Sequence, residues 1–132
     1  MHQATAMAGV RRFEDLDCWK LANELKLEIY ELTERPHVKV DRTFCDQIRR
    51  AVASAPANIA EGFGRRSDTE FARFLDITRG SLNECRNHIR DAEDRTHIEE
   101  KERSALDSLA SRAVGAVAGL QRYLRREKQK RR

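Results

Sequence analysis

The most constraining feature of the chain is an alternation of apolar positions at steps of four and three residues between positions 71 and 92. This spacing aligns the apolar side chains along one helix face and is typical of a seam in a left-handed helical bundle. The seam consists of Phe71, Leu75, Thr78, Leu82, Cys85, Ile89 and Ala92. Ser67 and Glu70 precede it with the spacing of a capping box, which begins a helix. We therefore predict a helix over residues 67–94, about 42 Å long.

Apolar periodicity predicts three more helices. The first ends before Pro36 and is followed by a loop over residues 35–40, and the second contains Pro56. A proline inside a helix removes one amide donor, so we expect a kink near Pro56. Gly62 and Gly64 are expected to end the second helix by adopting backbone angles closed to other residues. The three stripes are Cys18, Ala22, Leu25, Ile29 and Leu32; Phe44, Ile48, Val52, Ala55, Ile59 and Phe63; and Leu106, Leu109, Ala113, Val117, Leu120 and Leu124.

Four helices joined by short loops are most simply packed as an all-α, antiparallel up-down-up-down four-helix bundle. The 132 residues suffice for one such domain. Charged residues make up 36% and aromatic residues 6%, a composition that favours amphipathic helices over a sandwich or barrel. We predict a flexible N-terminal arm over residues 1–12, the bundle over residues 13–124 and a basic C-terminal tail over residues 125–132.

Composition also indicates the compartment. No apolar run approaches the roughly 20 residues that span a bilayer, and the first residues lack the apolar core of a secretory signal. We therefore expect a cytoplasmic protein without membrane contact. Cys18, Cys45 and Cys85 are odd in number and fall on apolar helix faces, so we expect buried thiols without disulfides or zinc.

Motifs for catalysis are missing from the sequence. The only Glu-x-x-His motif, from Glu34 to His37, contains Pro36, which breaks the helix that would aim both ligands inward. Glu84 and His88 share a helix face, but one such pair is more often a surface interaction than a metal site. No nucleophile elbow or phosphate-binding glycine loop occurs. We predict no catalytic residues, metal or cofactor, and hence no enzyme.

The first helix is apolar on two sides. Its second apolar cluster is displaced by more than about 100° from the main stripe. A soluble chain usually hides such a patch, so we expect a second copy of the chain to cover it. The residues of this predicted oligomer interface are Leu16, Trp19, Leu27 and Tyr30.

Basic residues suggest a nucleic-acid surface. The net charge is +4, and residues 125–132 hold six basic residues and one acidic residue. Guanidinium groups can bind phosphates bidentately, so RNA is one candidate partner. Acidic residues intermix with the arginines, and ion pairs within or between subunits, or a merely solvated tail, are alternatives. The candidate nucleic-acid-binding residues are Arg49, Arg50, Arg79, Arg86, Arg90, Arg125, Arg126, Lys128, Lys130, Arg131 and Arg132.

Polar residues are densest at the corner between the second and third helices. This predicted structural or partner-binding corner contains Asn58, Glu61, Gly62, Arg65 and Arg66. Asn58 and Glu61 are one helical turn apart and can face the same way. We favour a structural role in which they hold an arginine, ahead of a ligand pocket and, last, catalysis.

The segment around this corner resembles a known family. It contains RRAVASAPANIAEGFGRR, then EFARFL and GS, which is similar to the pattern of the 23S rRNA intervening sequence proteins. The resemblance runs over residues 13–124 and includes the unusual proline in the second helix. Ala55 and Cys85 depart from it, because bulkier apolar residues are common at these positions.

This resemblance implies an antiparallel four-helix bundle that assembles into a ring, typically a homopentamer, with RNA or protein as a partner. Accessory proteins of diversity-generating retroelements, which act beside a reverse transcriptase and RNA, look similar. Our first functional hypothesis is a non-enzymatic, ring-shaped platform for structured RNA, with ribosomal RNA suggested by the resemblance. The alternative is a protein–protein scaffold or accessory factor without direct nucleic-acid binding.

Overall fold

The computed structural model describes residues 9–131, which form helices and their connections. A short 3-10 helix, η1 (Phe13–Asp15), precedes α2 (Asp17–Glu34), α3 (Pro36–Lys39), α4 (Arg42–Phe63), α5 (Asp68–Asp94) and α6 (Glu100–Lys130). The predicted all-α class is confirmed for this part of the chain. Residues 1–8 of the predicted arm and Arg132 of the predicted tail lie outside the described residues.

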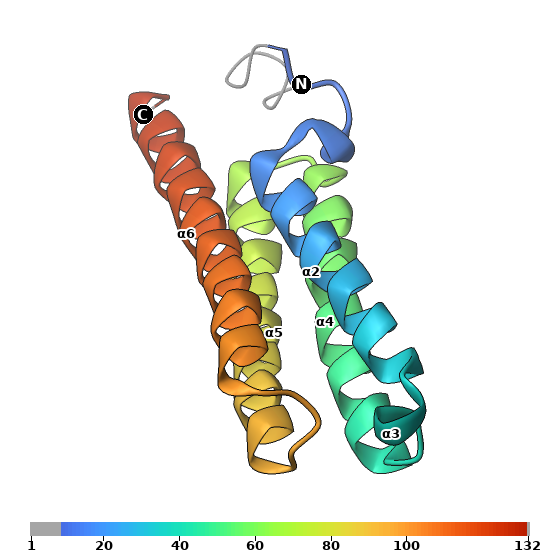
Figure 1. Cartoon of the computed structure of the whole chain (residues 1–132). Helices are drawn as coiled ribbons and strands as arrows, with labels where there is room; N and C mark the ends of the chain where they lie inside the picture. The colour runs from blue at the N-terminus through green and yellow to red at the C-terminus, as the bar shows by residue number, and fades with distance from the viewer. Residues whose placement is uncertain (1–8, 132) are drawn as a thin grey trace.

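The four long helices pack as a bundle. Helix α2 packs against α4 and α6, and α5 also packs against α4 and α6. Figure 1 shows the start of α2, the connection between α4 and α5 and the end of α6 at one end of the molecule. We call this the corner end. Helix α3 and the α5–α6 connection lie at the opposite end, which we call the loop end.

The predicted seam of α5 lies in the core. Phe71, Leu75, Leu82, Cys85 and Ile89 are all completely buried. The helix also begins where predicted, because the Ser67 Oγ accepts a hydrogen bond from the Glu70 amide at 3.1 Å. Local sequence signals therefore define this helix correctly at its start and along its buried face.

Two segments are more helical than predicted. Residues 36–39 of the predicted loop form α3, with Pro36 as its first residue, a position where the fixed φ of proline favours a helix. The predicted basic tail continues α6 as far as Lys130. Its arginines, lysines and glutamine are good helix formers, and cations are favourable near a helix C-terminus.

Helix α4 ends near Gly62 and Gly64 as predicted, but the predicted reason, a backbone conformation open only to glycine, is wrong. Helix α4 does end at Phe63, but among the described glycines only Gly9 has a positive φ. Gly64 caps the helix with a φ of −79°, an angle open to any residue. Gly62 instead lies where α4 and α5 are in close contact, so a missing side chain, not backbone freedom, explains this glycine.

A strained residue ends α5. Thr96 has a φ of 63°, in the left-handed region that favours glycine. The His97 amide donates to the Ala92 carbonyl and the Thr96 amide to the Glu93 carbonyl, both at 2.9 Å. This is the Schellman arrangement, in which the left-handed position is usually glycine.

Replacing Thr96 with glycine should therefore stabilise the protein by about 1 kcal/mol, because a β-branched side chain is costly in the left-handed region. Thermal and urea denaturation would measure the gain. Thr43 is an exposed threonine inside α4, and Thr43→Gly should have the opposite effect. Equal losses in both variants would contradict this account of Thr96.

Ion pairs connect the segments that meet at the loop end. Arg35 binds Glu102 with two hydrogen bonds, Nη1 to Oε1 at 2.8 Å and Nη2 to Oε2 at 2.6 Å. The Asp41 Oδ2 contacts the His97 Nε2 at 2.8 Å and the Arg95 Nη1 at 3.0 Å. The bonds from Arg35 lower the pKa of Glu102, and those from His97 and then Arg95 lower the pKa of Asp41.

These shifts predict an acid-sensitive loop end. Because the folded-state pKa values are depressed, the two carboxylates contribute stability above their unfolded-state pKa values of about 4. This contribution is lost as the pH falls through the folded-state values. The urea midpoint should therefore fall less between pH 7 and pH 3 in the double variant Asp41→Asn, Glu102→Gln than in the wild type. An unchanged pH dependence would show that these pairs do not stabilise the fold.

Candidate functional site

Residues of the predicted corner contact one another and helix α5. The Glu61 Oε2 accepts from the Arg65 Nη2 at 3.0 Å, and the Arg65 guanidinium lies 4.8 Å from the centre of the Phe74 ring. A Cβ added to Gly62 would lie 2.8 Å from the Phe74 Cβ. The carboxylate thus holds an arginine over an α5 aromatic ring, while Arg66 is exposed beside them.

Asn58 forms hydrogen bonds with Ser54, one helical turn earlier in α4, and not with the Glu61–Arg65 pair. Its Nδ2 donates to the Ser54 carbonyl at 2.8 Å and to the Ser54 Oγ at 3.0 Å. The Ser54 Oγ lies 2.8 Å from the Ser81 Oγ of α5. Asn58 therefore supports a polar contact between α4 and α5.

Several predicted nucleic-acid-binding arginines pair within the chain. The Arg86 Nε binds the Asp107 Oδ1 at 2.9 Å, and Arg90 lies 3.7 Å from Glu93. Arg49 donates to the Thr33 Oγ1 at 2.8 Å and its guanidinium lies 4.2 Å from the Tyr30 ring centre. Arg86 and Arg90 agree with the ion-pair alternative, Arg49 is held by Thr33 and Tyr30, and Arg50 is exposed.

The predicted oligomer interface divides into buried and accessible residues. Leu16 is only 5% exposed and belongs to the core of its own chain, so it offers little surface to a partner. Trp19 is half-buried, with its ring centre 5.5 Å from that of Phe13. Leu27, at 56% exposed, and half-buried Tyr30 remain accessible on α2.

Three predicted basic residues meet at a groove between α5 and α6. Arg79 comes from α5, and Arg125 and Lys128 come from the last turns of α6. The groove has a volume of about 300 Å³. The remaining lining residues are Asp68, Thr69, Ala72, Asp76, Gln121 and Leu124. We call this the α5–α6 groove.

A buried amide organises the groove. Gln121 is 7% exposed, and its Nε2 donates to the Ala72 carbonyl at 3.2 Å and to the Asp76 Oδ1 at 2.7 Å. Its Oε1 accepts from the Arg79 Nη1 at 3.2 Å. Gln121 therefore links an anion and a cation of α5 to α6.

Further contacts hold the end of α6 against the first turn of α5. The Lys128 Nζ donates to the Thr69 Oγ1 at 2.9 Å, and Arg131 pairs with Asp68. Lys130 lies 3.4 Å from Glu127 on α6 itself. The other two predicted basic residues of this helix end are exposed and form no ion pair within residues 9–131; they are Arg125 and Arg126.

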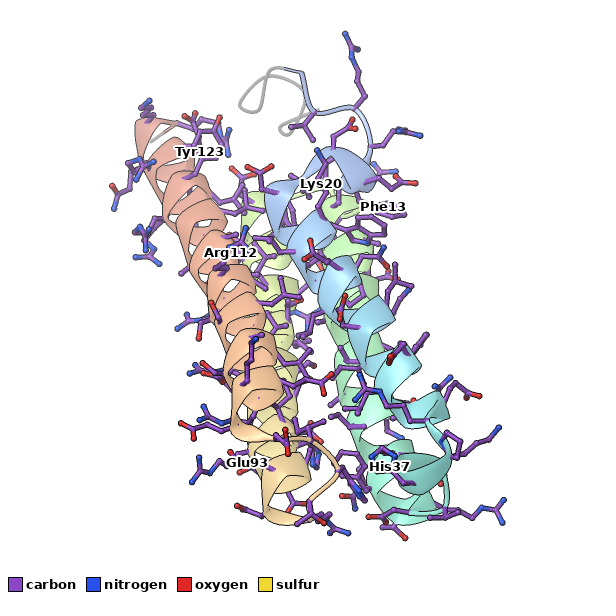
Figure 2. All side chains as sticks on the ribbon, in the orientation of Figure 1. Phe13, Lys20, His37, Glu93, Arg112 and Tyr123 are labelled. Atoms are coloured by element: carbon purple, nitrogen blue, oxygen red, sulfur yellow. The ribbon has the colours of Figure 1, made fainter. Side chains whose placement is uncertain are left out.

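Figure 2 helps to locate the groove within the molecule. Tyr123 labels the last turns of α6 at the corner end, whereas His37 and Glu93 lie at the loop end. The basic surface of α6 and the acid-sensitive ion pairs thus occupy opposite ends of the bundle. A ligand at the α5–α6 groove would leave the loop end untouched.

Gln121 and Asp76 were missed by sequence reasoning. Gln121 lies four residues after Val117 and three before Leu124, so a polar residue at a buried helical position was the available signal. Asp76 has no such signal, because only the packing of α5 on α6 brings its carboxylate to Gln121.

Within residues 9–131, no three His, Cys, Asp or Glu side chains gather in a way that could hold a metal ion. Cys18, Cys45 and Cys85 are buried free thiols, as predicted. Burial raises the pKa of Cys18 and of Cys85 to about 12, which keeps both thiols protonated near neutral pH. No helix in this range is long and apolar enough to cross a membrane.

Comparison with known proteins agrees with the resemblance in the sequence. A family model described as 23S rRNA-intervening sequence protein matches residues 14–118. No curated protein matches the chain. The predicted family resemblance is thus confirmed, and the matched segment ends before Gln121, Arg125 and Lys128 of the groove.

Proposed function

Since the chain belongs to the 23S rRNA-intervening sequence protein family, we propose that it is a non-enzymatic, oligomeric helical bundle that binds structured RNA. The family description mentions an rRNA and makes ribosomal RNA the first ligand to test. The bundle in this proposal has the antiparallel up-down-up-down connectivity and the bend near Pro56 that the sequence predicts. It works in the cytoplasm.

The observation that carries the RNA proposal is the gathering of cations at the corner end. Arg79, Arg125 and Lys128 line one groove, and Arg122 and Arg126 are exposed on the same last turns of α6. Cations that replace the counterions around phosphates are the main source of affinity in nucleic-acid binding. Arg35, by contrast, pairs with Glu102 at the loop end.

Self-assembly would multiply this surface. Leu27 and Tyr30 offer apolar area on α2, and burying it against another copy would remove it from water. The family resemblance implies a ring, typically a pentamer. Such a ring would repeat the basic end of α6 in each subunit and so increase the avidity for RNA. Sedimentation velocity should detect the oligomer, and Leu27→Glu should shift it toward monomer. A wild-type monomer at micromolar concentration would contradict the assembly.

The RNA proposal is tested by fluorescence anisotropy with a labelled rRNA hairpin. If about six phosphates are contacted, affinity should fall by about a thousandfold between 50 and 200 mM salt. A sulfate-free buffer avoids competition from a divalent anion. Absence of binding at 50 mM salt, or an affinity indifferent to salt, would rule out an electrostatic RNA-binding surface.

A protein scaffold is the second candidate, favoured by the exposed polar side of the corner. Glu61 and Arg66 are exposed there, next to the structural contacts of Gly62 and Arg65. In this case Glu61→Ala and Arg66→Ala should change assembly or the capture of a protein partner and leave RNA affinity unchanged. Loss of RNA affinity in these variants would argue against the scaffold.

A further inference from the structure

The α5–α6 groove contains two carboxylates: Asp68, which pairs with Arg131, and Asp76, which phosphate binding alone does not require. Asp76 lies among the cations Arg79, Arg125 and Lys128, and its Oδ1 accepts from the Gln121 amide at 2.7 Å. A surface that binds only phosphates would be weakened by this negative charge. The groove therefore contains groups for two different parts of a ligand.

Gln121 sets the orientation of both charged groups. The Ala72 carbonyl can only accept a hydrogen bond, so the contact at 3.2 Å identifies the Gln121 Nε2 and leaves Oε1 to accept from Arg79. The same Nε2 holds Asp76. Gln121 is buried, whereas Asp76 and Arg79 are exposed, so the amide provides one fixed hydrogen-bond partner for each of these charged groups.

The groove also has a small apolar part. Half-buried Ala72 contributes to it, whereas Leu124 is only 1% exposed and adds almost no surface, and the groove has a volume of about 300 Å³. This volume is at the lower limit for small-molecule sites, which are mostly apolar with a few fixed polar groups. A flat ring that carries hydrogen-bond donors on one edge and an anionic group fits this combination.

We propose that the α5–α6 groove binds one unstacked guanine nucleotide. Guanine presents two adjacent donors, N1–H and the 2-amino group, which match the acceptors of one carboxylate, here Asp76. Adenine, cytosine and uracil each place an acceptor beside their donor on the same edge. The ring would lie over Ala72, with its phosphate against Arg79, Arg125 and Lys128.

This inference rests on the proposed RNA function when the nucleotide belongs to an RNA loop, where unpaired bases are accessible to proteins. A free guanine nucleotide has the same chemistry and is a second possible source. The two sources are separated by comparing RNA hairpins with GMP and AMP. Both measurements use the full-length protein.

The test is a pair of hairpins that differ only by guanine or adenine at one loop position. The guanine hairpin should bind about tenfold tighter, as expected for one bidentate base contact. Asp76→Asn should abolish this preference and keep the bond from Gln121, because the asparagine Oδ1 remains an acceptor. Asp94→Asn, the same change at the far end of α5, should retain the preference, and both variants should keep the wild-type melting temperature.

The outcomes separate the two proposals. Salt-dependent RNA binding without a guanine preference, or a preference that survives Asp76→Asn, would overturn the guanine site and leave the RNA function standing. If no RNA binds, NMR titration decides: GMP should shift the Gln121 side-chain amide signals more than AMP does, and only when Asp76 is present. That result would support a free-nucleotide site, whereas equal or absent shifts would overturn it.

Discussion

Replacing Gly62 with alanine is expected to destabilise the bundle by about 2 kcal/mol, and Gly62→Val by more. The added Cβ would lie 2.8 Å from the Phe74 Cβ and 2.9 Å from the Phe71 Cδ1. Phe71 is completely buried and Phe74 is 8% exposed, so neither ring can move without disturbing the core. Urea denaturation followed by circular dichroism would measure the loss.

Two other helical glycines provide matched controls. Apart from the backbone of their own helices, no atom of residues 9–131 lies within 4 Å of a Cβ added to Gly80 or Gly115, and both glycines are exposed. Alanine there should stabilise the protein by up to about 1 kcal/mol, because alanine has the higher helix propensity. The same substitution thus has opposite signs at different sites. If Gly62→Ala were also stabilising, α4 and α5 would not be in the close contact inferred here.

Charge reversal at the basic end of α6 should cause the largest change in RNA affinity. Arg122, Arg125 and Arg126 are exposed and form no ion pair within residues 9–131. Replacing all three with glutamate should weaken RNA binding by at least about a hundredfold at low salt. The slope of the logarithm of the binding constant against the logarithm of the salt concentration should become less steep by about one for each lost phosphate contact. Anisotropy titrations at several salt concentrations would measure both quantities.

The matched control reverses three basic residues at the loop end, Lys39, Arg42 and Lys101, all of them exposed. It changes the net charge equally but should alter RNA affinity much less, because these residues lie far from the α5–α6 groove. Equal losses in both triple variants would indicate that only net charge matters. That result would remove the assignment of RNA binding to α6, although the bundle itself would be unaffected.

The predictions for α5, which depended on local patterns, agree with the structure. The step of four and three over α5 identified its buried side chains, and Ser67 marked its first turn. These signals are local, because helical periodicity and capping involve residues within one or two turns of each other. The family was also recognisable from the residues around the corner, and its model matches residues 14–118.

Predictions that depended on the partner of a side chain were less accurate. Leu16 and Trp19 share one apolar cluster in the sequence, yet Leu16 is buried in its own chain while Trp19 is half-buried beside Phe13. Helical periodicity assigns residues to a face but does not say which faces meet within one subunit.

The sequence by itself therefore determined the four long helices as far as Leu124, their buried apolar stripes and the family, because these follow from the spacing of neighbouring residues. Only the tertiary structure decided the reason for Gly62, the pairing of Arg86 with Asp107 and the polar contacts of Gln121. Each depends on residues from two different helices, and these residues lie at least nine positions apart in the chain. Contacts between helices arise from packing in three dimensions, which no periodicity along a single helix specifies.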